Sequence, residues 1–336
     1  MKRLAIALPV LAQRGNLLLA SHRAARGKQL RPAVAKYFSD LDGNLMRLGA
    51  SILDGGAPQG LSHSFVIHDP KRRTISAACF ADRVLHHAIL NLVEARFERM
   101  LVSSTYACRP GLGVHAAVRA VQRHLQRFAW VVQVDVAAYF PSIDHVRLKT
   151  LLAARFKGAG FLALLGRIVD SGATARGQLP GVGLPIGALT SQHFANAYLD
   201  AADRFLLDHV AVRAHARYMD DILWCCDSRA AAVTTLAQFT CYVQEAWGLT
   251  IKPQAHIGPS AAGVRYCGFR VRPGVVLASK RKLSRYRRHT AAIDAAYDGG
   301  QCVAEIQRAS DAAHAALTHA QTLGFRQRLW ARRLDA

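Results

Sequence analysis

Hydrophobic positions recur at helical spacing along several stretches of the chain. Within residues 82–100 the apolar positions follow steps of three and four, at Leu85, Ile89, Leu92, Val93, Phe97 and Met100. Within residues 114–128 the same spacing joins Val114, Val118, Val121, Leu125 and Phe128. Residues at these steps share one side of an α-helix, so both stretches are predicted to be helices that bury one face. Residues 16–50 and 145–170 are predicted to be helical as well.

Shorter runs that are rich in β-branched and aromatic residues predict strands. Residues 64–76, "SFVIHDPKRRTIS", indicate two short strands around a basic turn. The run "WVVQVDV" at 130–136 predicts a buried strand that ends near Asp135. Residues 212–226 predict a hairpin around two adjacent aspartates, and residues 256–279 predict a further pair of strands.

Composition limits the class of protein. The chain has 336 residues, of which 51% are hydrophobic, so it can bury a sizeable core in two or three lobes. Lys and Arg number 44 against 22 Asp and Glu, which gives a net charge of +22. This excess favours a polyanionic partner whose binding weakens with salt. The alternative is an Arg-rich surface that reflects only the base composition of the genome.

The compartment is predicted to be a reducing cytosol. The seven cysteines are scattered and none forms a C-x-x-C pair, so neither a zinc ribbon nor a disulfide framework is indicated. No run approaches about 20 apolar residues, so no membrane span and no membrane partner are expected. The first residues, "MKRLAIALPVLAQ", imitate a signal peptide, but Pro9 interrupts their apolar stretch.

The adjacent aspartates in "RYMDDIL" are the main chemical signal. Carboxylates are rare in apolar runs unless a cation neutralises them. Side chains alternate along a strand, so Asp220 is predicted to be the principal ligand and Asp221 the lesser one. With Asp135 they would form a hard oxygen site for Mg²⁺, and two such ions support nucleotidyl transfer. The alternative is that Asp220 and Asp221 only cap a surface hairpin.

Several blocks resemble the conserved blocks of reverse transcriptases, in their order and spacing. They are "VVQVDVAAYFPSIDH", "GLPIGALTSQHFANAYLD", "ARYMDDILWC" and "RYCGFRV", and the upstream stretches "FVIHDPKRRTISAACFADRVLHHAI" and "STYACRPGLGVHAA" resemble the fingers blocks. The resemblance covers about residues 16–275. It implies an α+β right-hand polymerase fold, with a palm of antiparallel sheet plus helices. The implied domains are an N-terminal segment and fingers at 1–110, a palm at 111–275 with a fingers portion at 145–182, and a basic helical thumb at 276–336.

The resemblance assigns the metal and sugar sites. Asp135, Asp220 and Asp221 match the catalytic, metal-binding aspartates, and the backbone carbonyl of Val136 is a further expected ligand. The cofactor is two Mg²⁺ ions, with Mn²⁺ able to substitute. Phe140, five residues after Asp135, matches the bulky gate that clashes with a 2′-hydroxyl and so selects deoxynucleotides. Without the resemblance, Phe140 would be taken for an ordinary core aromatic.

The basic fingers turn is expected to bind the incoming triphosphate. Lys71, Arg72 and Arg73 match this turn, and Arg73 is the best single candidate because an arginine recurs before the second fingers strand. Flexible cations and planar guanidinium groups suit a triphosphate. An exposed basic turn without function is the alternative.

The Gly- and Pro-rich loop at 177–187 leads into a helix predicted to begin near Thr190 or Ser191. Ile186 occupies the position of a glutamine that contacts nucleotide and template in most relatives. Its side chain offers no hydrogen bond, so base-pair selection should weaken by roughly 1–3 kcal/mol, or about tenfold to a hundredfold. Gly187 would allow close approach of the backbone to the base pair. Gln192 is expected to touch nucleotide or template, and Ser191 to bind nucleic acid or cap the helix.

The block "IGALTSQ" also indicates a subgroup. It resembles the corresponding block in reverse transcriptases of diversity-generating retroelements. Group II intron and retron enzymes usually have a glutamine before the glycine and a proline after the serine. The resemblance therefore implies an error-prone RNA-directed DNA polymerase that makes cDNA from a template-repeat RNA in mutagenic retrohoming, in a bacterial or phage-encoded system.

Several roles are less specific. Lys252 is a candidate to protonate pyrophosphate, and His256 is the alternative. Arg109 is a candidate for contact with the template backbone, with a buried salt bridge as the alternative. Tyr266 and Gly268 match the turn that grips the primer.

The basic stretch 279–289, "SKRKLSRYRRH", is expected to bind the primer–template duplex as a helix. Clustered cations suit an A-form hybrid, which is held mostly through its backbone and shape. The nucleic-acid-binding candidates here are Lys280, Arg281, Lys282 and Arg285. A solvated helix face is the alternative.

The expected partners are template RNA, primer, the RNA–DNA hybrid and deoxynucleoside triphosphates, with a small basic accessory protein as a further candidate. Two other functions remain open. One is a reverse transcriptase of a retron, a group II intron or a phage-defence system. The other is an inactive RNA-binding scaffold with a polymerase fold, which the presence of all three aspartates disfavours. A palm-type cyclase would explain the aspartates but not the basic charge.

Overall fold

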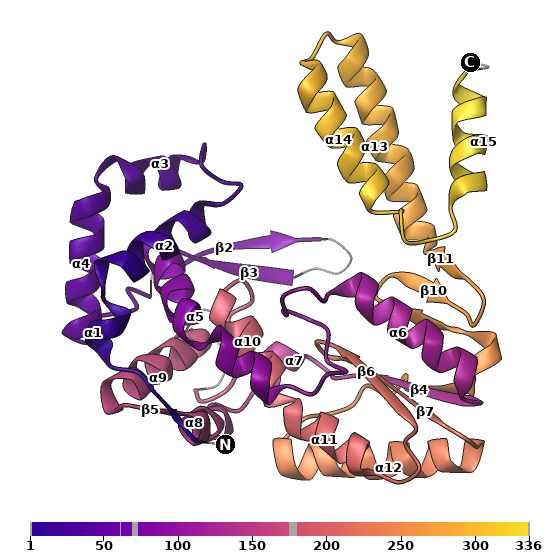
Figure 1. Ribbon diagram of the computed structural model, residues 1–336, viewed down its shortest axis with the longest axis horizontal. Helices are drawn as coiled ribbons and strands as arrows, with labels where there is room; N and C mark the ends of the chain where they lie inside the picture. The colour runs from indigo at the N-terminus through magenta and orange to yellow at the C-terminus, as the bar shows by residue number, and fades with distance from the viewer. Residues whose placement is uncertain (1, 61, 69–72, 175–179, 335–336) are drawn as a thin grey trace. The chain divides into compact units, whose positions relative to one another are not determined.

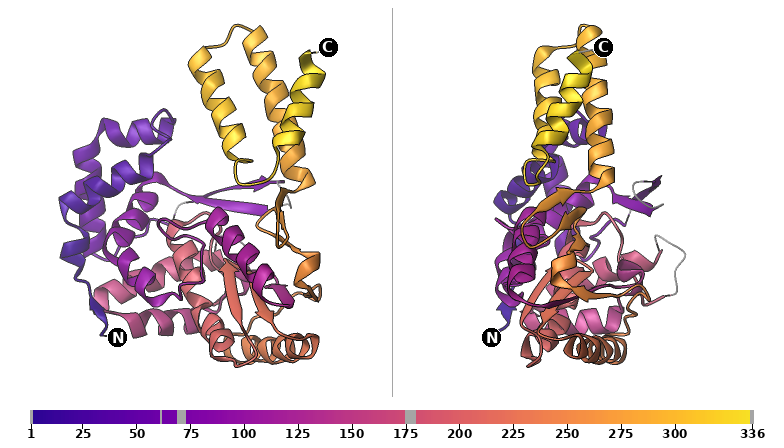
Figure 2. Two further views of the ribbon diagram at one scale, coloured as in Figure 1. Left: turned by 45° about the vertical axis from the view of Figure 1, so that its right-hand side comes forward. Right: turned by 90° about the vertical axis from the view of Figure 1, so that its right-hand side faces the viewer.

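The computed structural model describes residues 2–60, 62–68, 73–174 and 180–334, and Figures 1 and 2 show it. The chain forms two compact units, each built from separate stretches of sequence. The first unit contains residues up to Val102, Val136–Arg204 and Thr240–Ile251. The second contains Ser103–Asp135, Phe205–Phe239 and residues from Lys252 onward. No helix in the described ranges is both long and apolar enough to cross a membrane.

The first unit is mainly helical. Its elements are β1 (Leu4–Ala5), α1 (Leu8–Leu11), α2 (Arg14–Ala25), α3 (Pro32–Ser39), α4 (Leu41–Leu53), β2 (Ser62–Ile67), β3 (Arg73–Ala78), α5 (Phe80–Met100), α7 (Tyr139–Ser142), α8 (His145–Arg155), β5 (Phe156–Lys157), α9 (Ala159–Thr174) and α10 (Leu189–Tyr198). The apolar face of α5 packs against α10, where the rings of Phe97 and Phe194 lie 6.1 Å apart. Strands β2 and β3 form the predicted antiparallel hairpin.

The second unit is built on a four-stranded antiparallel sheet in the order β6-β7-β4-β8. Its strands are β4 (Trp130–Asp135), β6 (Ala214–Tyr218), β7 (Asp221–Cys226) and β8 (His256–Pro259). Figure 1 shows α6 (Val114–Arg127) beside β4, β6 and β7. Alternate side chains of the sheet face α6 and a small second sheet, so Val131 and Leu223 share one core with Val118 and Val121.

The second sheet has the order β11-β10-β9 and leads into helices. Its strands are β9 (Val264–Tyr266), β10 (Phe269–Val271) and β11 (Val276–Ala278), and the 3₁₀ turn η1 (Ser260–Ala262) precedes them. Helices α13 (Lys280–Asp298), α14 (Val303–Ala315) and α15 (Leu323–Leu334) follow. Figure 2 shows α13 and α14 as a helical hairpin. A small hydrophobic core stabilises it and contains Tyr286, Ala313 and Leu317. Helices α11 (Asp200–Asp208) and α12 (Arg229–Trp247) contribute residues to both units.

Two boundaries differ from the sequence predictions. The helix predicted over 145–170 is two helices, because Phe156–Lys157 pairs in parallel with Leu4–Ala5 and interrupts it. Gly158 follows with φ +119°, and a Cβ there would lie 2.5 Å from the Ile6 carbonyl oxygen. Residues 256–279 contain four strands, so the prediction of two strands there is wrong. Strand β8 joins the larger sheet, and three further strands follow it.

Candidate active site

The two adjacent aspartates lie at a tight turn between β6 and β7. Tyr218 pairs with Asp221, so Met219 and Asp220 alone form the turn. Met219 has φ +56°, a conformation that two-residue hairpins usually give to glycine. The Arg217 side chain, which is fully buried, donates from Nη1 to the Met219 carbonyl oxygen at 3.0 Å. A left-handed non-glycine residue is therefore held in place from beneath the turn.

Asp135 and Asp221 face each other directly across the β4–β7 pair. Like charges in this position repel. Burial is the largest cause that raises the pKa of Asp221 to about 7, and the Asp135 and Asp220 carboxylates raise it further, against a hydrogen bond from Gln133. The three predicted aspartates are thus close enough to interact. Which of Asp220 and Asp221 is the principal metal ligand stays a prediction.

Two groups that sequence reasoning missed hold Asp221. Gln133 Nε2 donates to Asp221 Oδ1 at 2.8 Å and also to the Arg265 carbonyl oxygen at 2.9 Å. The Cys267 backbone N–H bonds to the Asp221 carboxylate and lowers its pKa. The sequence signal for Gln133 was its position two residues before Asp135, which places both on one face of β4.

Lys252 lies beside Asp135. Its backbone N–H donates to the Asp135 carbonyl oxygen at 2.9 Å, and its ammonium group forms an ion pair with the Asp135 carboxylate. His256, the alternative proton donor, is exposed on β8 opposite Gln133. Val136, whose carbonyl is an expected ligand, is buried and forms a bridge with Ile251.

The donor set fits a hard divalent cation, although no three His, Cys, Asp or Glu side chains within the described ranges converge closely enough to hold one as they lie. Carboxylate oxygens are the ligands that Mg²⁺ prefers, and the carboxylates of Asp135, Asp220 and Asp221 lie near enough for their charges to interact. A cation would also offset the repulsion that raises the pKa of Asp221. The Lys252 ammonium pairs with Oδ1 of Asp135, which leaves the second carboxylate oxygen to an ion.

The loop that contains Ile186 packs on strand β3. The Ser76 N–H donates to the Ile186 carbonyl oxygen at 3.0 Å. Gly187 has φ +123°, and a Cβ there would lie 2.8 Å from the Ser76 carbonyl oxygen. The close approach that Gly187 permits in this structure is therefore to strand β3. Phe140, half-buried in α7, accepts a backbone hydrogen bond from Leu184 of the same loop at 2.9 Å.

Helix α10 begins at Leu189, one residue before the predicted start near Thr190. Its N-cap is Ala188, so Ser191 does not cap it, and the proposed capping role is wrong. Ser191 is fully buried, so contact of its side chain with nucleic acid would need α10 to move. Gln192 is half-buried on the same helix. Lys71 and Arg72 lie outside the described residues, and the backbone of Arg73 begins β3 opposite Ile67.

The two predicted primer-grip residues, Tyr266 and Gly268, differ in their exposure to solvent. Tyr266 is fully buried in the core beneath the sheet, and its hydroxyl donates to the Asp221 carbonyl oxygen at 3.4 Å. Its side chain therefore supports the site from behind and does not reach a surface. Gly268 is exposed, with φ +77° in the turn between β9 and β10. Arg109 donates to the Thr105 carbonyl oxygen at 2.9 Å.

The basic residues of α13 divide into two groups. Lys280, Arg281 and Arg285 are exposed. Lys282 is half-buried, its Nζ lies 3.8 Å from the centre of the Phe269 ring, and burial lowers its pKa. Lys282 is thus engaged with the β9–β10 hairpin, and contact of its exposed neighbours with nucleic acid stays a prediction.

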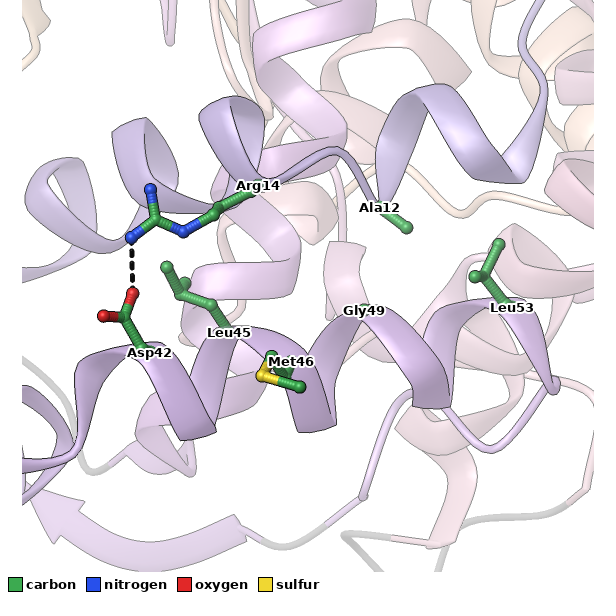
Figure 3. Close-up of a pocket in the computed structure, with 7 residues that line it drawn as sticks. All are labelled: Ala12, Arg14, Asp42, Leu45, Met46, Gly49 and Leu53. Atoms are coloured by element: carbon green, nitrogen blue, oxygen red, sulfur yellow. Dashed lines mark hydrogen bonds and ion pairs between the residues drawn. The ribbon is translucent and has the colours of Figure 1, made fainter.

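An open pocket of about 420 Å³ lies in the N-terminal helices (Figure 3). Its lining residues are Ala12, Arg14, Asp42, Leu45, Met46, Gly49 and Leu53. The Arg14–Asp42 ion pair, 2.5 Å long, joins α2 to α4 beside it. None of the predicted site residues lines it.

The antiparallel sheet ending in carboxylates, with its flanking helices, is that of an α+β right-hand polymerase. The family described as "Reverse transcriptase (RNA-dependent DNA polymerase)" matches residues 67–271, and the chain belongs to this family. This confirms the resemblance and the fold class that the sequence implied.

Individual relatives match smaller parts. Group II intron-encoded protein LtrA of Lactococcus lactis subsp. cremoris is 25% identical over 56% of this chain and 32% of its own length. Protein YkfC of Escherichia coli K12 is 28% identical over 44% of this chain and 39% of its own. This chain therefore spans well under half of these relatives. A solved telomerase from Candida tropicalis, in complex with a fragment of telomeric RNA, gives a TM-score of 0.49 at 9% identity, over 76% of this chain and 52% of its own.

Proposed function

We propose that the protein is an RNA-directed DNA polymerase that extends a primer 3′-hydroxyl with deoxynucleoside triphosphates. The observation that supports this most is the register of β4 and β7, which sets Asp135 opposite Asp221 beside the turn that contains Asp220. A scaffold without activity would gain nothing from carboxylates that repel one another. The net charge of +22 suits template RNA, primer and their hybrid as partners.

Three side chains and one carbonyl would hold the cofactor. Two Mg²⁺ ions bound by Asp135, Asp220, Asp221 and the Val136 carbonyl would activate the primer hydroxyl and stabilise the leaving pyrophosphate, and Mn²⁺ could substitute. Lys252, whose ammonium group pairs with Asp135, would give a proton to the leaving group. His256 remains the alternative donor.

The remaining site candidates would select the nucleotide. Phe140 would exclude ribonucleotides by a clash with the 2′-hydroxyl, and Lys71, Arg72 and Arg73 would bind the triphosphate. Ile186 offers the base pair only apolar bulk, which lowers fidelity. The block IGALTSQ, which contains Ile186, is the ground on which we assign the protein to the diversity-generating retroelements, whose polymerases copy a template-repeat RNA with errors. A small basic accessory protein is a candidate partner, and reduced thiols suit a cytoplasmic location.

The relatives favour a second candidate, a polymerase of group II intron type, because LtrA is described as a group II intron-encoded protein. The two candidates differ in error pattern. Errors concentrated at template adenines support the retroelement, and evenly spread errors support the intron type or a retron or phage-defence enzyme.

The test is primer extension by the purified protein on an RNA template with Mg²⁺ and four deoxynucleotides, followed by sequencing. Extension should vanish when Asp220→Ala and Asp221→Ala are combined. The Ile186→Gln variant should lower the error rate by about tenfold to a hundredfold, and Ile186→Val serves as its apolar control. No extension, even with a cognate RNA and accessory protein, would favour the RNA-binding scaffold.

A further inference from the structure

Gln133 makes two hydrogen bonds at the centre of the site. It lies on β4 two residues before Asp135, so both side chains face the same side of the sheet. Its register partner on β7 is Leu223, which makes Asp221 its diagonal neighbour. The two hydrogens of its amide nitrogen go to Asp221 Oδ1 at 2.8 Å and to the Arg265 carbonyl oxygen at 2.9 Å. The donor capacity of this amide is fully used.

The hairpin β9–β10 binds the same aspartate twice more. The Cys267 N–H bonds to the Asp221 carboxylate, and the Tyr266 hydroxyl donates to the Asp221 carbonyl oxygen at 3.4 Å. Arg265, Tyr266 and Cys267 are consecutive residues that lead into the turn at Gly268. Gln133 therefore links the Asp221 carboxylate to the β9–β10 hairpin, and each of the two restricts the movement of the other.

We propose that Gln133 is a positioning residue that fixes the Asp221 carboxylate and couples its orientation to the β9–β10 hairpin. This inference rests on the proposed polymerase function, in which that hairpin grips the primer. Asp221 cannot turn away from Asp135 to relieve their repulsion without losing the bond to Gln133. The primer strand and the carboxylate are then held in one geometry, which an in-line displacement requires.

An amide is better suited than a cation to orient the Asp221 carboxylate. A lysine or arginine at position 133 would bond to Asp221 more strongly, but it would also compete with a metal ion for the carboxylate charge. The Gln133 amide orients Asp221 and leaves its charge in place. Lys252 shows the contrast, since its ammonium forms an ion pair with Asp135.

The first experiment compares Gln133→Met with Gln133→Glu in primer extension at saturating Mg²⁺. Methionine keeps the length of the side chain and loses the donor, so kcat should fall about tenfold to a hundredfold with little change in the deoxynucleotide KM. Glutamate keeps the shape and adds a charge against Asp221, so it should be worse than methionine. The matched control is Gln126→Met, because Gln126 on α6 also donates to a backbone carbonyl, that of Pro273, at 2.5 Å. This control should retain wild-type kcat.

The second experiment needs no activity and no metal. Thermal unfolding in EDTA is measured for Gln133→Met alone and in the Asp221→Ala background. The Tm should fall by about 2–4 °C when Asp221 is present and by less than half of that when it is absent. Equal shifts in both backgrounds, or a Gln133→Met enzyme with wild-type kcat, would overturn the inference. If the wild-type protein does not extend a primer, the proposed function fails, while the unfolding cycle still decides whether Gln133 and Asp221 are coupled.

Discussion

The carboxylate end of the β6-β7-β4 sheet and the start of α13 both concentrate charge, of opposite sign, but they hold it differently. At the sheet, Asp221 is bonded to Gln133 and to the Cys267 N–H, and Asp135 is paired with Lys252. On α13, Lys280 and Arg288 are exposed, whereas Lys282 lies over the Phe269 ring of the same unit.

The proposed function accounts for this difference. A metal-dependent transfer needs oxygens fixed to within a fraction of an ångström, and fixed charges need internal partners. A nucleic-acid backbone presents many equivalent phosphates, so mobile, exposed cations suffice and each adds a similar small increment. Single substitutions should therefore act strongly at the sheet, and weakly but additively on α13.

The largest effect is expected for Asp135→Asn. The neutral amide removes one of three ligand charges and the partner of Lys252, so kcat of primer extension should fall about a thousandfold or more. Asp227→Asn is the matched control, since Asp227 forms an exposed ion pair with Arg213 at 2.8 Å outside the site. A loss of less than tenfold in Asp135→Asn would contradict the role of this carboxylate.

The sequence predicted most of the sheet end, because its signals are local. A run of β-branched residues located β4, and two apolar runs that flank the aspartates located the β6–β7 hairpin. The spacing of apolar residues located α5 and α6 within a few residues of their observed ends.

The contacts that hold the site could not be predicted in the same way. The bond from Gln133 to Asp221 joins residues 88 positions apart, and no periodicity specifies the register that brings them together. The burial of Tyr266 and the ring contact of Lys282 likewise depend on how β9 and β10 pack. A sequence motif marks these residues as important without saying which of them faces the nucleic acid.

The second prediction concerns Arg217, which lies beneath the turn. The variant Arg217→Met loses the hydrogen bond to the left-handed Met219 and a 3.5 Å bond to Thr105, so the unfolding free energy should drop by about 1–3 kcal/mol. Because the turn carries Asp220, kcat should fall about tenfold at a temperature where the variant remains folded. Denaturant unfolding and primer extension measure the two effects. An unchanged kcat would show that the turn keeps its shape without Arg217.

The third prediction concerns Lys282, the half-buried lysine of α13. Removing the contact of Lys282 with Phe269 in Lys282→Met should destabilise the protein by about 1 kcal/mol, or about 2 °C in Tm. The exposed control Lys280→Met should leave the Tm unchanged. An unchanged Tm in Lys282→Met together with weaker binding to the hybrid would contradict this prediction. It would mean that Lys282 acts as a solvent-exposed cation, like Lys280.

The smallest effect is expected for single exposed cations of α13. Lys280→Gln or Arg288→Gln should each reduce the slope of log K for an RNA–DNA hybrid against log salt by about 0.9, because one phosphate contact releases about one counterion. The double variant should reduce it by about twice as much, since exposed sites act independently. Fluorescence anisotropy between 50 and 200 mM salt gives these slopes. A loss of all salt dependence from one substitution would mean that α13 presents a fixed site, and the contrast with the sheet would then fail.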